Sequence, residues 1–437
     1  MLLSPNQQLL PLTAQINDQQ HLTIGGCDVT ELVKEFGSPL YIVDELTVRT
    51  ACQQYEQSFK QFYDADYLVL YASKAWSCTA LCALVASEGL GIDVVSGGEL
   101  YTALQAGVAP HTIYLHGNNK SAQEIKEAVQ AGCTIVLDNW HDIKLTESLG
   151  EARVMVRVAP GIDCHTHEYI RTGQRDSKFG FDLEQLPQVF AHLRSGSLKC
   201  VGLHAHNGSQ IFSLEHPQDL PKILLNYYKI ARTEFNLEFT ELNVGGGLGI
   251  RYTEADNPPT IGAWVQAVTQ GVKSACSELG LRLPKLLCEP GRSLIGPACI
   301  TAYTVGSQKV IPGVRTYITV DGGMSDNPRP ITYQAQYRAV VANRMHAPNA
   351  GLVTIAGKHC ESGDILIQDI DLPAVAAGDI VAVLATGAYN YSMASNYNRL
   401  PRLAAVLVQG GKAHLILRRE TYSDLLRQDV MPPHLQR

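Results

Sequence analysis

The chain has 437 residues, of which 45% are hydrophobic and 18% charged, and its formal net charge at pH 7 is -7. This length and composition predict two folded domains with full hydrophobic cores. The acidic balance argues against a nucleic acid or an acidic membrane surface as partner.

No apolar run approaches the roughly 20 residues that a membrane-spanning helix needs. The first twenty residues contain no Lys or Arg, so they lack the basic start of a signal peptide. The eleven cysteines are scattered and form no CxxC pair, which argues against a disulfide framework or a zinc ribbon. We therefore expect reduced thiols and a cytoplasmic protein with no bound metal.

The chain opens with a polar stretch, residues 1–20, that predicts a loosely ordered lead-in. Leu40–Asp44 then predicts a strand and Leu46–Tyr63 a helix. From there a rhythm begins, in which short runs rich in β-forming residues alternate with helical stretches such as Ser121–Ala131 and Pro259–Leu279.

Eight such runs follow one another: Tyr67–Ala72, Gly91–Val95, Thr112–His116, Thr134–Asp138, Arg153–Val158, Cys200–His206, Glu241–Gly247 and Lys285–Pro290. Strands that alternate with helices predict parallel pairing through right-handed crossovers. Eight units predict a closed (β/α)8 barrel of the TIM type. An open, doubly wound sheet is the alternative.

After about residue 300 the pattern changes, because β-rich runs follow one another without helices between them. These runs are Thr316–Val320, Gln334–Ala342, Gly351–Gly357 and Asp379–Ala385, and Ala404–Arg418 predicts a hairpin that turns at Gly410 and Gly411. The expected organisation is a lead-in with strands (residues 1–44), the barrel (45–300) and a C-terminal all-β domain (301–437).

Lys74 directly follows the apolar run Tyr67–Ala72. A lysine at the mouth of a buried strand is a candidate for Schiff-base chemistry, because partial desolvation lowers the pKa of its amine. An ordinary solvated lysine is the alternative, and on this stretch alone it is favoured. The ends of the other runs are also rich in reactive groups: Asp93, Ser96, His116, Asn118, Asp138, Arg157, His206, Ser209, Glu289 and Arg292.

Two of these ends carry recognisable patterns. Gly245, Gly246 and Gly247 follow a strand, and such a turn brings backbone N–H groups close to a phosphate, although glycines also mark ordinary tight turns. His204 and His206 lie two apart on a predicted strand, so both point to the same side. They fit a metal site, a ring stacked on a flat cofactor, or plain core histidines.

Glu289 and Arg292 lie in CEPGRS at the end of the last run. They fit either a salt bridge at a turn, or a carboxylate partner for a pyridinium nitrogen beside an arginine for an anion. A lysine, a carboxylate, a glycine-rich phosphate turn and a stackable ring together indicate pyridoxal 5'-phosphate as cofactor.

At these residues the sequence resembles the diaminopimelate decarboxylases, which belong to the alanine-racemase-like fold group of pyridoxal-phosphate enzymes. The resemblance runs from about Gly37 to Tyr397. It is carried by YASKA, GIDVVSGGELYTALQAG, HGNNKS, DSKFGF, GLHAHNGSQ, NVGGGLG, EPGRS, RPITY, CESGD and GAYNYSMASNYN. It implies a barrel followed by a β domain, and a homodimer with shared active sites.

By position, the resemblance implies roles for individual residues. Lys74 resembles the Schiff-base lysine and Cys360 the proton donor, which the other subunit contributes. The cofactor-binding set further comprises Asp93, His206 stacked on the ring, Ser209, Gly245, Gly246 and Gly247 at the phosphate, Glu289 at the ring nitrogen, Gly291, Arg292 and Tyr389. The substrate-binding set comprises Arg292, Arg329, Tyr333, Glu361 and Tyr389.

The sequence departs from the family's usual pattern at four places: Trp76 after Lys-Ala, Asn207 between His206 and Gly-Ser, Lys358-His359 before Cys360, and Asp326-Asn327-Pro328 before RPITY. None of them removes a reacting group. The first three border the expected site, where they could tune rate or substrate range.

The implied activity is decarboxylation of meso-diaminopimelate to L-lysine and CO2. Arg329 favours a substrate with a distal carboxylate, because a diamine-forming decarboxylase gains nothing from it. Alternatives are a related decarboxylase of a carboxylated polyamine precursor or of a basic amino acid, a metal-dependent barrel hydrolase and a non-catalytic pyridoxal-phosphate carrier.

Overall fold

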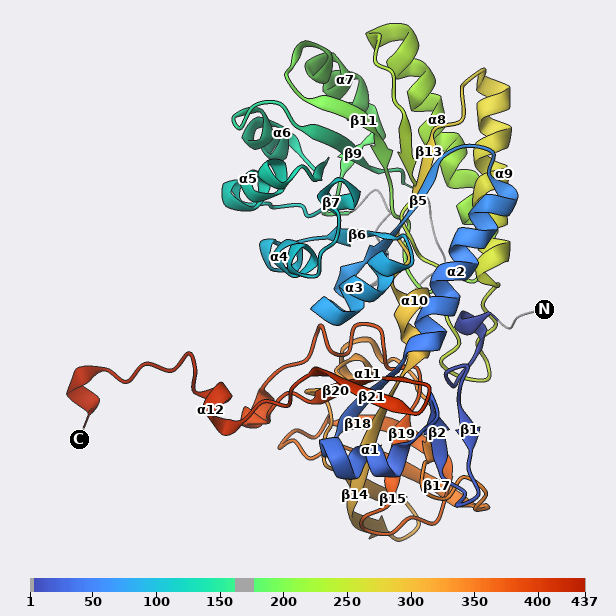
Figure 1. Ribbon diagram of the computed structural model, residues 1–437, viewed down its shortest axis with the longest axis vertical. Coiled ribbons are helices and arrows are strands. Elements are labelled where there is room, and N and C mark those ends of the chain that lie inside the picture. The colour runs from blue at the N-terminus through green and yellow to red at the C-terminus, as the bar shows by residue number, and fades with distance from the viewer. Residues whose placement is uncertain (1–3, 162–176, 437) are drawn as a thin grey trace. The chain divides into compact units, whose positions relative to one another are not determined.

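The structure is a computed structural model that describes residues 4–161 and 177–436. Its contacts divide the chain into two compact units (Figure 1). The barrel unit comprises Met1–Gln8 and Val48–Gly296, and the β unit comprises Leu9–Thr47 and Pro297–Arg437. The sequence limits at residues 44 and 300 stay predictions about folding domains, because a division by contacts does not test independent folding.

Eight parallel strands of the described part of the barrel unit close into a barrel. In chain order they are β5 (Tyr67–Ala72), β6 (Gly91–Val94), β7 (Ile113–Leu115), β8 (Thr134–Leu137), β9 (Arg153–Ala159), β11 (Lys199–His204), β12 (Glu241–Asn243) and β13 (Lys285–Cys288). Strand β5 pairs with both β6 and β13, so no edge stays open. The predicted barrel is confirmed and the open sheet is wrong. The short strand β10 (Phe181–Asp182) adds to β9.

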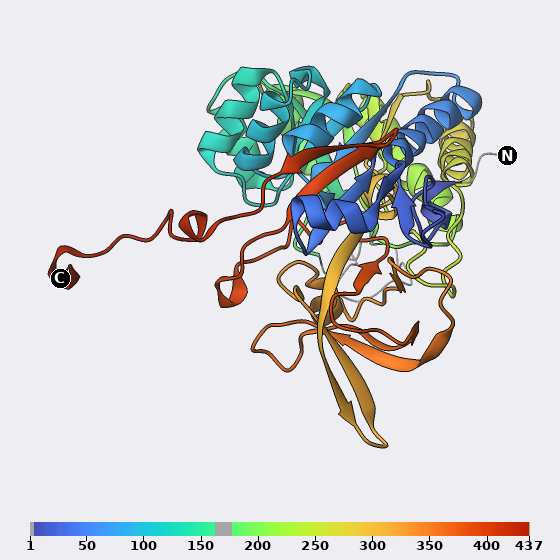
Figure 2. The same cartoon turned by 60° about the horizontal axis from the view of Figure 1, so that its bottom comes forward.

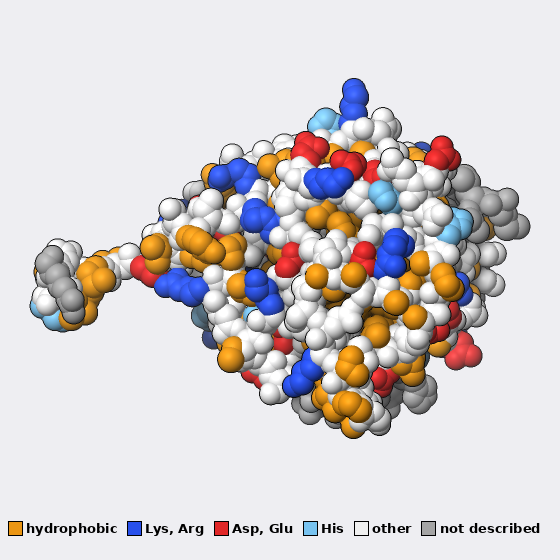
Figure 3. Space-filling view, turned by 90° about the horizontal axis from the view of Figure 1, so that it is seen from below, with side chains coloured by type: hydrophobic (Ala, Val, Ile, Leu, Met, Phe, Trp, Pro, Cys, Tyr) orange, Lys and Arg blue, Asp and Glu red, His pale blue; other side chains and the backbone are white. Residues whose placement is uncertain are grey.

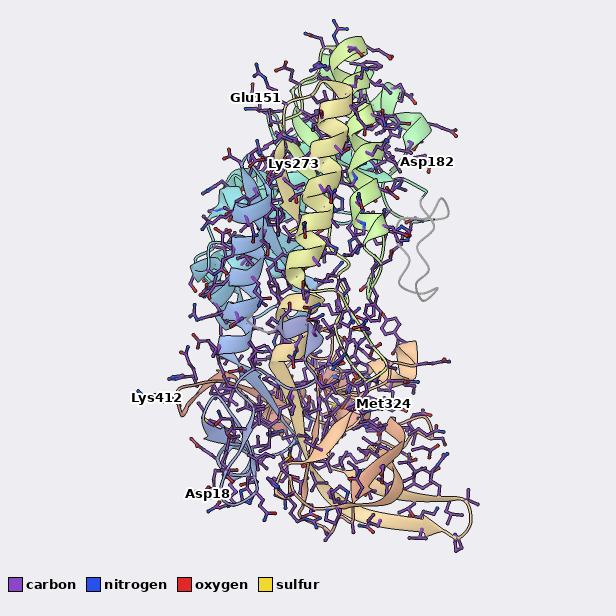
Figure 4. The ribbon with its side chains drawn as sticks, turned by 90° about the vertical axis from the view of Figure 1, so that its right-hand side faces the viewer. Asp18, Glu151, Asp182, Lys273, Met324 and Lys412 are labelled. Atoms are coloured by element: carbon purple, nitrogen blue, oxygen red, sulfur yellow. The ribbon has the colours of Figure 1, made fainter. Side chains whose placement is uncertain are left out.

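Helices alternate with these strands (Figure 1). They are α2 (Glu45–Phe62), α3 (Thr79–Ser87), α4 (Gly97–Gln105), α5 (Ala122–Ala131), α6 (Trp140–Glu147), α7 (Leu186–Ser195), α8 (Glu215–Phe235), α9 (Ile261–Leu279) and α10 (Arg292–Ile295). Local chemistry sets their ends: Ser121 and Glu124 form a capping box at the start of α5, and Gly132 ends it in the left-handed conformation. Lys273 on α9, labelled in Figure 4, pairs with Asp64 at 2.6 Å.

Buried apolar side chains fill the barrel interior, among them Leu70, Tyr114, Met155 and Leu287. The strands end earlier than the apolar runs suggested: β11 ends at His204 and β12 at Asn243. The segments that hold His206 and the three consecutive glycines are therefore loops beyond strand ends, where barrels of this kind place their reactive groups.

The start of the chain corrects one expectation. Ser4–Gln7 is not loose, because Pro5–Gln7 forms the 3-10 turn η1 and Asn6 is fully buried. The Asn6 amide donates to the carbonyls of Gly249 and Pro259 at 3.1 and 2.8 Å. A polar stretch looks disordered in sequence when its partners lie more than 240 residues away, since no local pattern records such a pairing.

The β unit contains a three-stranded sheet of β1 (Gln15–Ile16), β2 (Leu22–Ile24) and β3 (Cys27–Asp28), the helix α1 (Val29–Phe36), and a larger sheet (Figure 2). The larger sheet holds β4 (Leu40–Asp44), β14 (Cys299–Ile311), β15 (Arg315–Val320), β16 (Ala339–Val341), β17 (Asn349–Ala356), β18 (Ile365–Pro373), β19 (Ile380–Val383), β20 (Ala404–Gln409) and β21 (Lys412–Leu417). Strand β4 pairs with β14 and β20, which joins the start of the chain to this sheet.

The predicted hairpin at Gly410 and Gly411 is confirmed as β20 and β21, and both glycines have positive φ, as a type I′ turn requires. Other expectations were incomplete. Only Ala339–Val341 of the run 334–342 is a strand, β14 and β18 were not predicted, and the short helix α11 (Arg329–Tyr333) interrupts the β runs. The chain ends beyond the short helix α12 (Tyr422–Leu425).

No helix in the described ranges is long and apolar enough to cross a membrane.

Candidate active site

Lys74 lies in η2 (Ser73–Ala75), the single turn that follows β5, and its side chain is exposed. The turn after β13 packs on it: the Ala72 N–H donates to the Pro290 carbonyl at 3.1 Å. A Cβ on Gly291 would lie 3.1 Å from the Cβ of Ala72. The lysine turn and the EPGRS turn thus lie in close backbone contact, and glycine suits position 291 because a Cβ there would make tight contacts with Ala72 and Ala75.

Glu289, at the end of β13, lies at the centre of a buried polar cluster. Its carboxylate is 2.9 Å from His116 Nε2 and 3.0 Å from His204 Nε2, and it accepts a hydrogen bond of 2.6 Å from the Asn243 amide. Asp93 Oδ1 lies 3.9 Å from the same His116 nitrogen. Strands β6, β7, β11, β12 and β13 each place one side chain here, which explains why the groups are scattered in sequence.

The cluster holds Glu289 ionised. Burial alone would raise the pKa of Glu289, but His116 and His204 outweigh it and place that pKa well below its usual range. Burial lowers the pKa of His204 to about 4. Burial would also lower the pKa of His116, yet the charges of Glu289 and Asp93 raise it above the ordinary value. The pKa values of the two imidazoles that flank the carboxylate are therefore shifted in opposite directions, while burial raises the pKa of Asp93 to about 6.

The glycine-rich loop after β12 is packed without room for side chains. A Cβ on Gly246 would lie 2.3 Å from the Glu289 carbonyl oxygen, and one on Gly247 would lie 2.9 Å from the Gly208 oxygen. Gly245 and Gly247 have φ of 67° and 121°, a region that favours glycine. The Ile211 N–H donates to the Gly247 carbonyl at 2.9 Å, which ties this loop to the loop that carries Ser209.

Arg292, the first residue of α10, brings a buried guanidinium to these loops. It donates to the Ser209 hydroxyl at 2.7 Å and to the Tyr252 hydroxyl at 2.6 Å. The positive charge, the hydroxyl and the glycine-rich backbone are the components of an anion site, because N–H groups of tight glycine turns and arginine both favour phosphate.

The two histidines differ more than the sequence suggested. His204 ends β11 and is bonded to Glu289, whereas His206 lies beyond the strand and accepts the Gly246 N–H at 3.1 Å. The prediction that His204 and His206 point to the same side of one strand is therefore wrong, because β11 ends at His204. Burial drives the pKa of His206 well below its ordinary value, and the charge of Lys74 acts in the same direction. A neutral ring at this place suits stacking.

The β unit brings Arg329 and Tyr389, two residues of the predicted substrate-binding set, close together. Arg329, at the start of the short helix α11, is buried and donates to the Tyr337 hydroxyl at 2.6 Å. Its guanidinium carbon lies 5.9 Å from the centre of the Tyr389 ring, a cation–π distance. Tyr389 has a φ of 72°, and a bulky residue in that region indicates a local constraint of the kind that gathers at functional sites.

Cys360, Glu361 and Tyr333 lie nearer the surface of the β unit. Cys360 and Glu361 are exposed, and Tyr333 is half-buried. They belong to adjoining segments, because a Cβ on Gly363 would meet the Ile331 side chain of α11 at 2.8 Å. Asp364 anchors the loop: it accepts the His359 N–H at 2.9 Å and the Met324 N–H at 2.7 Å, and Figure 4 marks Met324.

The departures from the family pattern occupy defined places. Trp76 and Asn207 are buried, and Asn207 lines a small cavity with Val244 and Gly246. His359 is buried, and its Nδ1 lies 2.7 Å from Asp364. At the fourth place, Asp326-Asn327-Pro328, burial raises the pKa of Asp326 to about 6. Asp176 of the DSKFGF stretch lies outside the described residues.

Three buried residues at or near the Glu289 cluster were given no role from sequence: His116, Asn243 and Arg157. Arg157, near the end of β9, is buried over the Phe179 ring at 4.2 Å and lies 3.8 Å from Asp138. Their position at the ends of predicted strands was the one sequence signal available. That signal does not distinguish site residues from helix caps, such as Ser96, which accepts the Glu99 N–H at the start of α4, and Asn139, which caps α6.

Together these groups fit pyridoxal phosphate. Lys74 supplies the amine, Glu289 a carboxylate that is already ionised, His206 a neutral ring, and the Ser209, glycine and Arg292 segments an anion site. Neither the three glycines nor Gly291 leave space for side chains, so backbone lines this part of the site.

Comparison with known proteins agrees with this chemistry. The family described as pyridoxal-dependent decarboxylase, pyridoxal binding domain, matches residues 46–296. The chain is 57% identical over 446 residues to diaminopimelate decarboxylase of Synechocystis sp., covering 99% of this chain and 95% of that protein. It is 47% identical over 437 residues to diaminopimelate decarboxylase of Bacillus subtilis, covering 96% and 97%.

Solved structures give the same relationship. Diaminopimelate decarboxylase from M. jannaschii, in complex with L-lysine, superposes with a TM-score of 0.92 at 32% identity and covers 99% of this chain and 100% of that chain. Diaminopimelate decarboxylase from Helicobacter pylori, complexed with L-lysine, gives a TM-score of 0.82 at 30% identity, with coverage of 91% and 98%.

Proposed function

The chain belongs to the diaminopimelate decarboxylases, which depend on pyridoxal phosphate, and from that premise we propose how its residues divide the reaction. The reaction removes one carboxylate of meso-2,6-diaminopimelate to give L-lysine and CO2, the last step of lysine biosynthesis. Identity of 57% over nearly the whole chain carries this conclusion. The hydrolase and the non-catalytic carrier considered from sequence are set aside.

Lys74 would hold the cofactor covalently, and Ser209, Gly245, Gly246, Gly247 and Arg292 would hold its phosphate. When bound, pyridoxal phosphate supplies an electron-accepting ring for the pair left behind at the reacting carbon when the carboxylate departs. Lys74 is the candidate because it lies on the turn that packs against the Glu289 turn, and its charge reaches His206.

Glu289 would meet the ring nitrogen. His116 and His204 keep its pKa low, so its negative charge is available at neutral pH to favour a protonated ring nitrogen. His206 would stack on the ring, and the Gly246 N–H fixes the orientation of its imidazole. Asp93 adds a second carboxylate beside His116.

Arg329, Tyr333, Glu361 and Tyr389, with Arg292, would bind the substrate. The distal end of diaminopimelate carries both a carboxylate and an ammonium group, so it calls for a cation and an anion together. Arg329 supplies the cation and the exposed Glu361 the anion. Ornithine and lysine lack the distal carboxylate, so Arg329 discriminates against them.

Cys360 would return a proton to the reacting carbon, and we propose that it serves the barrel of a second copy in a homodimer. Its exposure in a lone chain supports this role, because a proton donor that faces a partner's site is uncovered when the partner is absent. The cytoplasmic location stays a prediction that rests on the scattered cysteines.

The test is CO2 release by the purified holoenzyme from diaminopimelate, lysine, ornithine and arginine, with L-lysine measured as product. We expect release from diaminopimelate alone, with one lysine formed for each CO2. Faster release from ornithine or lysine would replace the proposal with a diamine-forming decarboxylase. Preference for a carboxylated polyamine precursor would keep the chemistry and change the substrate.

A further inference from the structure

The Cys360 loop, residues 357–364, lies between β17 and β18. Within the loop, the Asp364 carboxylate accepts the backbone N–H of His359, and it also accepts that of Met324 outside the loop. Cys360 itself is bonded to a residue outside the loop, because its N–H donates to Asn398 Oδ1 at 2.9 Å. The His359 ring stacks on the Tyr397 ring, with 5.8 Å between centroids and 13° between planes.

Asn398 adopts an unusual backbone conformation to make this contact. Asn398 and Arg399 have φ of 53° and 57°, and among the described residues they form the one adjacent pair of non-glycine residues with positive φ. Asparagine tolerates this region better than most residues and arginine does not favour it. Such a pair persists when surrounding contacts hold it in place.

Those contacts come from the end of the chain. Arg399 donates to the Leu425 carbonyl at 2.8 Å, at the end of α12, and to Asp429 Oδ2 at 2.5 Å. On the other side of the turn, the Asn396 amide donates to Glu420 at 2.6 Å, and Glu420 also accepts the Arg402 N–H at 2.9 Å. The segment that carries the left-handed pair is therefore fastened to residues 420–429.

Beyond these anchors the C-terminal segment exposes apolar side chains, since Leu426 is 59% exposed and Val430 87%. Figure 3 shows hydrophobic side chains at the surface of the projecting segment. The hydrogen bonds that Arg399 makes with this segment go to Leu425 and Asp429, near the start of the segment.

We propose that Asn398 and Arg399 are positioning residues for Cys360: Asn398 holds the backbone of the thiol residue, and Arg399 fastens Asn398 to Leu425 and Asp429 at the C-terminus. The inference rests on the proposed role of Cys360 as proton donor. Placing the thiol on one face of the reacting carbon requires a fixed backbone at Cys360, because the side chain itself is exposed.

A pair of substitutions separates the hydrogen bond from the backbone strain. Asn398→Gly removes the acceptor but suits the positive φ better than asparagine does, so any loss comes from the missing contact. Asn398→Asp keeps an acceptor oxygen and tolerates the same φ. We expect Asn398→Gly to lower kcat about tenfold with KM little changed. Asn398→Asp should stay within about threefold of the parent.

The decisive measurement is a double-mutant cycle on the holoenzyme, with cofactor content checked for each variant. If Asn398 acts through Cys360, Asn398→Gly costs nothing further in a Cys360→Ala background. Full additivity would make Asn398 a structural residue and overturn the proposal. Parental kcat in Asn398→Gly alone would also overturn it, while leaving the role of Cys360 intact. Parental activity of Cys360→Ala would instead remove the proposed function of the thiol, and the positioning role with it.

A second readout does not depend on rate. In D2O, a fixed donor delivers deuterium to one face of the carbon that lost its carboxylate, so the lysine formed carries one configuration at that carbon. We expect Asn398→Gly and Asp429→Ala to give a mixture of configurations, and Asn398→Asp to restore the single one. A single configuration in all three variants would show that Asn398 and its contacts with the C-terminal segment do not position the thiol.

Discussion

At the scale of single residues, the site is a problem of charge burial. Glu289 carries a negative charge inside the barrel, and two imidazoles and an amide satisfy its oxygens at hydrogen-bond distance. A buried carboxylate without such partners would take up a proton. His116 and His204 therefore set the ionisation of Glu289, the residue that we propose meets the ring nitrogen of the cofactor.

His204 gives a prediction for the pH dependence of stability. Its folded-state pKa is lowered to about 4 by burial, whereas an unfolded histidine titrates near about 6.5. Between these values the unfolded chain binds the extra proton and the folded chain does not, so this residue makes stability fall as pH falls from about 6.5 to about 4. In His204→Gln, which keeps a donor for Glu289, urea unfolding midpoints should vary less with pH across that window.

His111→Gln, at an exposed histidine, is the matched control. If the parent and His204→Gln lose stability in parallel between those pH values, His204 is not held neutral by the fold.

At the scale of elements, the barrel could be predicted because each strand is a short apolar run bounded by polar turns. The end of β13 shows what the sequence does not predict. The sequence indicates a role for Glu289 at a ring nitrogen, which stays a prediction, and it does not indicate the partners His116 and Asn243, which follow or end the distant strands β7 and β12. A strand-end position indicates that a side chain can reach the site, and only the closed barrel decides which side chains meet. Asn6 was not predicted as buried for the same reason, since its hydrogen-bond partner Gly249 lies 243 residues away.

The prediction at the scale of elements concerns Arg329, the first residue of helix α11. Arg329→Ala should lower kcat/KM for diaminopimelate by about one to two powers of ten, because a charge-assisted contact to a carboxylate is worth roughly 1.5–3 kcal/mol. Binding of pyridoxal phosphate should change little, as judged by the absorbance of the holoenzyme during titration.

Arg338→Ala removes a cation from the same segment and is the control. Should Arg329→Ala turn over diaminopimelate at the parental rate, the RPITY helix would serve structure alone and the distal carboxylate would need another partner.

At the scale of the whole molecule, the proposed catalytic residues are divided between the two compact units. The barrel unit carries Lys74, Glu289 and the anion site, and the β unit carries Arg329, Cys360 and Tyr389. Neither unit alone holds both Lys74 and Cys360. The proposal that the thiol comes from a second copy makes the homodimer the smallest active species.

The shared-site proposal is tested by mixing two severely impaired variants, Lys74→Ala and Cys360→Ala, of which Cys360→Ala keeps a low rate that can be measured. After an equal mixture is refolded, random pairing makes about half of the dimers mixed, and each mixed dimer has one site with both defects and one with neither. About a quarter of all sites should then work, and lysine should form at about a quarter of the parental rate per site. If each thiol served its own chain, every site would keep one defect. Activity no higher than the mean of the two variants, with mixed dimers shown to be present, would show that the active site is not shared between subunits.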